Sequence, residues 1–122
     1  MKARSIAVGL ATDTGGGSSF SMLRTMAAAY EIAQLRGVAL HASQLLWLAT
    51  AGSARSLHLQ DHIGSLKVGN DADICILDLA STPAIAQRST RATDVWEALF
   101  PTLMMGDDRA IADVWVQGQR RS

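Results

Sequence analysis

Cysteine is nearly missing from this chain, proline is scarce, and neither sign of charge is in excess. Among 122 residues there is one cysteine, Cys75, so an intramolecular disulfide is excluded and a reducing, cytoplasmic location is expected. Lys plus Arg and Asp plus Glu are each 11, and this balance gives no sign of a nucleic-acid partner. No apolar run approaches the roughly 20 residues that cross a bilayer, so no membrane partner is expected.

The chain has enough hydrophobic residues to form the core of a folded domain. Hydrophobic residues make up 48% of the sequence, which excludes wholesale disorder. The length suits one compact domain.

The N-terminal third is predicted to form one β–α unit. Residues 6–11 are a short apolar run that ends before three glycines, which is typical of a strand buried on both faces. A helix is predicted from Ser18 or Ser19 to Arg36, with Gly37 as its C-terminal stop. Its apolar residues cover a broad arc, so we expect it to pack against more than one neighbour.

The rest of the chain is predicted as short, mixed elements. Helices are expected over about 42–50 and from a Ser53 cap through 59, and strands over 72–79 and 113–117. Residues 80–94, with Pro83, are predicted as a loop, and Pro101 is expected to limit helix continuity within 96–105. One parallel-type strand cannot build a parallel sheet, so the chain either associates with other copies or is the tail of something longer.

Asp13 is the first candidate for chemistry. It follows the predicted buried strand, and sites in α/β folds gather at the carboxyl ends of parallel strands. A carboxylate there can bind a metal ion or act as a base, but the spacing alone favours the alternative of an Asx turn or loop cap, because Asp before Gly is common in turns. The glycines at 15–17 could cradle a phosphate or simply form a tight turn.

The remaining candidates have ordinary structural explanations. His58 and His62 are four apart, as two metal ligands on a helix would be, but they are expected to flank a surface loop. His41 is expected at a helix start, and Cys75 is expected to be a small buried hydrophobe. Three tryptophans lie in apolar contexts and are expected to be core residues: Trp47, Trp96 and Trp115.

Four strings in the chain, taken in order, resemble the amidohydrolase superfamily, and within it the guanine deaminase family. They are GLATDTGGGSSFSML at 9–23, LATAGSARSL at 48–57, IGSLKVGNDADI at 63–74 and MGDDR at 105–109. The third string marks the superfamily, where the chain leaves the barrel for a small β domain. The first and fourth favour the guanine deaminase family.

The resemblance implies an α/β fragment of a (β/α)₈ barrel with an attached β-sandwich. Residues 1–62 would be the C-terminal part of the barrel, with its last strand and the following helices. Residues 63–122 would be the C-terminal β segment of the sandwich, with a connecting helix or loop. Asp13 matches the family's metal-binding and catalytic aspartate, so zinc is the implied cofactor. The family's His-x-His, its two further metal histidines and its glutamate are absent from this sequence, and His41, His58 and His62 match none of them.

The function implied is part of a zinc-dependent guanine deaminase of purine catabolism, with guanine or a related aminated ring as substrate. The chain alone is expected to be inactive, because catalytic zinc sites use about three protein ligands. One alternative is a non-catalytic module for self-association, since a homo-oligomer would cover its apolar faces. Another is a different ring aminohydrolase of the same superfamily.

Overall fold

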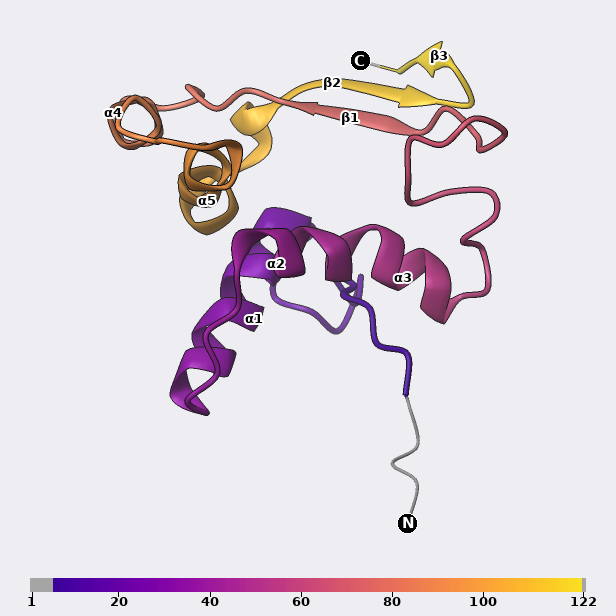
Figure 1. Ribbon diagram of the computed structural model, residues 1–122, viewed down its shortest axis with the longest axis horizontal. Helices are drawn as coiled ribbons and strands as arrows, with labels where there is room; N and C mark the ends of the chain where they lie inside the picture. The colour runs from indigo at the N-terminus through magenta and orange to yellow at the C-terminus, as the bar shows by residue number, and fades with distance from the viewer. Residues whose placement is uncertain (1–5, 122) are drawn as a thin grey trace.

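The computed structural model describes residues 6–121, in which a group of helices is joined to a narrow antiparallel sheet (Figure 1). Along the chain the elements are α1 (Met22–Leu35), α2 (Ala42–Ala49), α3 (Ala51–Ser56), β1 (Ile74–Leu77), α4 (Pro83–Ser89), α5 (Val95–Met105), the 3-10 turn η1 (Asp108–Ala110), β2 (Ile111–Val116) and β3 (Gln119–Arg120). Residues 1–5 and 122 of the two predicted domains lie outside the described residues. The sheet runs along one side of the helices (Figure 1).

The first helix confirms its prediction, apart from a later start. It begins at Met22, after Ser21, rather than after Ser18 or Ser19. Gly37 ends it with a φ of +74°, and the N–H groups of Gly37 and Val38 donate to the carbonyls of Gln34 and Ala33. This is a Schellman stop, which favours glycine at the left-handed position. The broad apolar arc does pack against two neighbours, α2 and α5.

The predicted buried strand at 6–11 is wrong. These residues form no strand, and Ile6 and Val8 are 78% and 56% exposed. A parallel-type strand needs neighbours to accept its amides and cover its faces. Within residues 6–121 the only sheet is β1–β2–β3, so this run has no neighbouring strand.

The predicted loop at 80–94 is also wrong, because it contains α4. Thr82 Oγ1 accepts the Ile85 N–H at 3.3 Å, Pro83 occupies the first helical turn, and the Ile85 side chain is fully buried. Proline is tolerated there because a first-turn N–H has no helical partner to lose. Pro101 does not interrupt α5 either, which continues from an Asp94 cap to Met105.

The second and third helices are present near their predicted positions. His41 caps α2: its N–H donates to Gln44 Oε1 at 2.8 Å, and its Nδ1 accepts the Ser43 N–H at 3.2 Å. Helix α3 begins at Ala51, so Ser53 lies inside it and is not its cap. The prediction that Trp47 is a core residue is wrong, because its side chain is 46% exposed.

The two predicted strands are confirmed as β1 and β2, which pair antiparallel, and β3 adds a third strand to the sheet. Gln117 and Gly118 join β2 to β3 with φ of +50° and +75°. Two successive positive φ values are typical of the tight turn that suits strand twist. Cys75 is exposed on β1, contrary to the prediction that it is buried, because the described residues do not cover that face.

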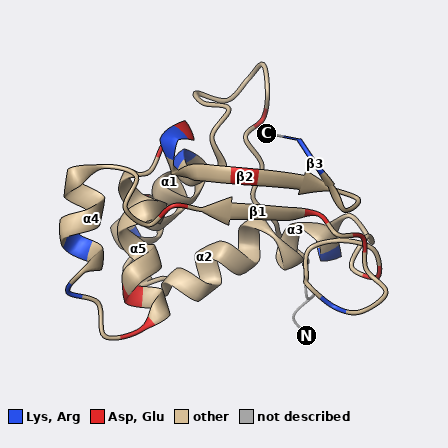
Figure 2. Ribbon diagram, turned by 90° about the horizontal axis from the view of Figure 1, so that it is seen from above, with Lys and Arg blue, Asp and Glu red and all other residues tan. Residues whose placement is uncertain are grey.

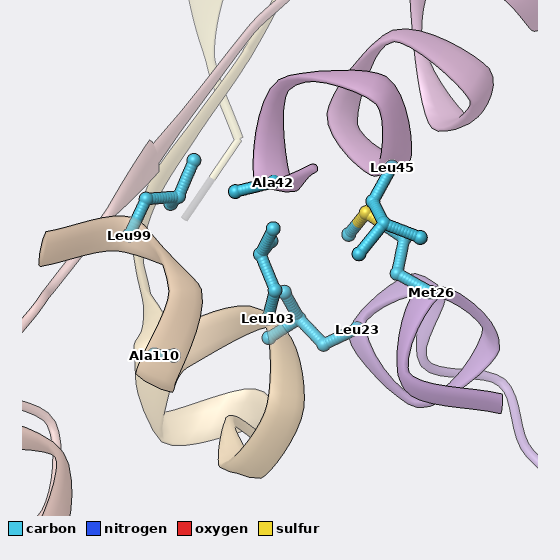
Figure 3. Packing of buried hydrophobic residues seen from close by; sticks show 7 residues of the cluster. All are labelled: Leu23, Met26, Ala42, Leu45, Leu99, Leu103 and Ala110. Carbon is cyan, nitrogen blue, oxygen red and sulfur yellow. The ribbon is translucent and has the colours of Figure 1, made fainter. Parts of the chain in front are cut away.

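The core is small and lies between α1, α2 and α5 (Figure 3). It consists of seven buried apolar side chains: Leu23, Met26, Ala42, Leu45, Leu99, Leu103 and Ala110. The sheet reaches it through the partly buried Leu77 of β1, while Ala110 belongs to η1, directly before β2.

The accessible surface is large for the mass of the chain. It measures 8743 Å² for 13.0 kDa. A folded monomer of that mass exposes roughly 6,300 Å². Large hydrophobic residues contribute to this exposed surface, among them Leu35, Leu66 and Val68.

Candidate functional site

Asp13 lies in the loop between the extended N-terminal segment and α1. Its φ is +51°, and its carbonyl oxygen accepts the N–H of Gly16 at 2.9 Å and that of Gly17. Among non-glycine residues, aspartate is one of the few that tolerates this left-handed backbone. The side chain is exposed.

The segment before Asp13 is held by α2 and α3. The Leu10 N–H donates to the Leu48 carbonyl at 3.0 Å, and Ser53 Oγ lies 3.0 Å from the Leu10 oxygen and 2.8 Å from the Leu48 oxygen. A Cβ on Gly9 would lie 2.5 Å from Ser53 Oγ, so only glycine allows this approach. Ser53 therefore positions the segment that carries Asp13, a role that its sequence position did not indicate.

The glycine loop is a tight turn around the Asp13 carboxylate. Gly15 has a φ of +101°, and a Cβ on Gly16 would lie 2.7 Å from Asp13 Oδ2. The amides of Gly16 and Gly17 already donate to the Asp13 carbonyl, so a phosphate would have to compete for them. The turn interpretation accounts for this geometry better than the phosphate cradle.

The described residues do not form a complete zinc site. No group of three or more His, Cys, Asp or Glu side chains in 6–121 is arranged to hold a metal ion. His58 and His62 are exposed in the turns after α3, where His58 has a φ of +60°. Asp13 is therefore a single carboxylate, which does not fit a catalytic zinc site by itself.

The third string of the resemblance connects α3 to the sheet. Gly64 has a φ of +87°, and a Cβ on it would lie 2.7 Å from the Ala54 Cβ. Asn70 Nδ2 donates to the Ser65 carbonyl at 3.3 Å. Asp73 Oδ1 accepts the Gln117 N–H at 2.8 Å, at the turn between β2 and β3. This string is a structural connector rather than a reactive centre.

The fourth string contains a charge-assisted hydrogen bond at the start of η1. Arg109 Nη2 lies 2.6 Å from Asp107 Oδ2, and Arg109 Nε lies 3.0 Å from Asp107 Oδ1. The side-chain hydrogen bond from Arg109 is the main reason that the pKa of Asp107 falls below its usual value. The same bond raises the pKa of Arg109.

The charged residues of 6–121 are spread over several elements. Figure 2 shows Lys and Arg as well as Asp and Glu on the helices, on the sheet and in the loops between them. Within residues 6–121, no helix combines the length and apolar character needed to cross a membrane.

Comparisons with known proteins agree on one family. The amidohydrolase family model matches residues 1–121. Guanine deaminase of Escherichia coli (strain K12) is 37% identical over 116 residues, which are 95% of this chain and 26% of that protein. The solved structure of E. coli guanine deaminase has a TM-score of 0.91, with 95% of this chain and 27% of that chain covered.

Two further solved structures are similar. Guanine deaminase from Bradyrhizobium japonicum has a TM-score of 0.86 at 26% identity, covering 95% of this chain and 31% of that one. An adenosine deaminase from Xanthomonas campestris with bound zinc has a TM-score of 0.65 at 28% identity, covering 84% and 22%. The chain thus spans about a quarter of the length of the guanine deaminase of E. coli that it matches.

Proposed function

The chain belongs to the amidohydrolase family, and from that premise we propose that it is the part of a guanine deaminase that carries the metal-binding aspartate. The whole protein would convert guanine and water to xanthine and ammonia. Residues 1–62 would complete the barrel wall, and residues 63–122 would add strands to the attached β-sandwich. The similarity to guanine deaminases over 95% of the chain is the observation that carries this proposal.

Asp13 is the residue proposed to contribute to the chemistry. It lies in a strained, left-handed position that aspartate tolerates, and such positions cluster at functional sites. Its exposed carboxylate would provide one ligand, and residues outside this chain would have to provide the others. The chain alone is therefore proposed to be inactive.

The accessible surface supports a larger assembly. The excess over a folded monomer of this mass is about 2,400 Å², the scale of an extensive permanent interface. Apolar side chains contribute to it on the N-terminal segment and on α1, where Ile32 is 57% and Leu35 is 83% exposed. Large exposed apolar patches are rare on monomers, so these side chains are proposed to face the rest of a barrel.

The sharpest test is a chimera in which this chain replaces the matching quarter of E. coli guanine deaminase. We expect ammonia release from guanine, loss of that release in Asp13→Asn, and little change in Asp61→Asn, an exposed acid outside the loop. A folded chimera that retains full activity with Asp13→Asn would contradict the role of Asp13. Activity on another aminated ring, but not on guanine, would favour a different aminohydrolase.

The alternative of a self-association module is tested on the chain alone. Zinc and guanine should give no ammonia, whereas turnover abolished by Asp13→Asn would overturn the proposed inactivity. Light scattering after gel filtration measures the oligomeric state, and we expect an oligomer because the apolar faces are uncovered. A monomer at micromolar concentration would argue against obligate self-association.

A further inference from the structure

A pocket of about 480 Å³ opens between four helices and contains neither Asp13 nor the glycine loop. Its walls include Tyr30 of α1, His41 at the start of α2, Arg88 of α4, Arg91 just after α4, and Trp96 and Glu97 of α5. Small-molecule sites have volumes of roughly 300–1,000 Å³ and combine apolar walls with a few polar groups. The pocket therefore has the size and the lining of a small-molecule site.

Aromatic rings make up much of the wall, and neighbouring rings hold them in place. The Trp96 ring lies edge-on to the His41 ring with centroids 6.0 Å apart. The Tyr30 and Phe100 rings are 5.2 Å apart at 71°. Rings fixed in this way present faces and edges that favour a planar aromatic ligand.

The charge of the pocket favours an anion. Neither Arg88 nor Arg91 forms an ion pair in the described part of the chain. The one acidic lining residue, Glu97, keeps its negative charge, but its Oε2 accepts the N–H and the hydroxyl of Thr93, each at 2.9 Å, and the two arginines outnumber it. Two guanidinium groups three residues apart thus have donors available for a carboxylate or a phosphate.

We propose that this pocket binds a small planar aromatic anion. The guanidinium groups of Arg88 and Arg91 bind its carboxylate or phosphate, and its ring packs against Trp96. This site is independent of the proposed deamination, because none of its lining residues belongs to the Asp13 loop. If the pocket binds no ligand, the expected ammonia release by the chimera is unaffected. If the chimera releases no ammonia, the expected binding in the pocket is unaffected.

The test is an NMR titration of the 122-residue chain with phenyl phosphate and, separately, with benzoate. The reporter is the indole N–H of Trp96, assigned with Trp96→Phe. We expect a saturable shift that weakens as salt is added, because the charges are exposed and screened. Binding of only one of the two probes identifies the anionic group that the pocket takes.

Matched variants locate the site. Arg88→Gln and Arg91→Gln should each weaken binding by about two- to fivefold, as expected for exposed charges. Arg24→Gln, on α1 outside the pocket, should bind like the unaltered chain. These arginines are exposed, so the variants should keep the far-UV circular dichroism of the parent.

Three results would overturn the proposal. The first is a lack of saturable shift with either probe. The second is inorganic phosphate binding as tightly as phenyl phosphate, since the ring would then contribute nothing. The third is equal binding by the Arg88→Gln, Arg91→Gln and Arg24→Gln chains.

Discussion

Replacing Leu103 with alanine should remove a large part of the stability of this chain. Leu103 is fully buried and reaches from α5 toward Leu23 of α1 in the small core (Figure 3). Leucine-to-alanine changes in cores cost about 2–5 kcal/mol through lost transfer energy and the cavity left behind. Three helices enclose this site, which limits its collapse, so we expect about 3 kcal/mol.

A loss of about 3 kcal/mol is large compared with the free energy of unfolding expected for this chain. A chain of this length has a free energy of unfolding of roughly 6–18 kcal/mol when its surface is typically covered. The uncovered surface of this chain puts it toward the lower limit. The loss should therefore lower the urea midpoint by about 1–3 M, given an m-value of roughly 1–3 kcal/mol/M.

The assay is urea unfolding followed by far-UV circular dichroism, with Leu35→Ala as the matched control. Leu35→Ala removes the same atoms from another helix, but Leu35 is 83% exposed. The loss in free energy of unfolding should therefore stay within about 0.5 kcal/mol. The packing argument fails if Leu103→Ala costs less than about 1 kcal/mol. It also fails if the two variants cost the same.

Three further predictions concern single side chains. Ser53→Ala should cost about 1–2 kcal/mol in urea unfolding, because a part-buried hydroxyl that bridges two carbonyls is lost; an unchanged midpoint would contradict this. The pKa of the Asp107 carboxyl, measured by NMR titration, should lie below the usual pKa of an aspartate, and Arg109→Gln should raise it toward that value. Because folding lowers this pKa, any stability that the carboxylate contributes is present above the unfolded pKa. That stability is lost as the pH falls through the folded pKa. The thiol of Cys75 should react with a disulfide reagent in the folded chain, more slowly than a free cysteine at the same pH because partial burial raises its pKa; no reaction before unfolding would show that it is covered.

The elements that local chemistry determines were predictable from the sequence. The arc of α1 and its Gly37 stop depend on residues within the helix, and β1 and β2 follow from short apolar runs. Pro83 alone does not predict α4, because proline occurs both in loops and in the first turn of a helix; the Thr82 cap decides between them. Pro101 does not end α5, contrary to the prediction, because packing of α5 in the core offsets one missing hydrogen bond.

Burial of several apolar residues is wrongly predicted from the sequence, and for a different reason. The sequence predicts that the run at 6–11, Trp47 and Cys75 are buried. In the structure most of the run is exposed, although Leu10 packs against the core, Trp47 is 46% exposed, and Cys75 is exposed. Apolar character indicates that a side chain will be covered, but it does not indicate by which part of the protein. The sequence therefore carries the pattern of a larger buried structure, and the described residues supply only part of the cover.

The strings that resemble the family mostly encode packing rather than chemistry. Gly9 allows the N-terminal segment to approach Ser53, and Gly64 allows the third string to approach Ala54, so two of the strings meet on α3. A chain could keep each of these contacts and still lack activity. Asparagine tolerates the left-handed backbone of Asp13 as well as aspartate does and has nearly the same shape. Asp13→Asn is therefore expected to leave the scaffold unchanged while it removes the charge, so its effect in the chimera tests the proposed chemical role of this carboxylate separately from any role in folding.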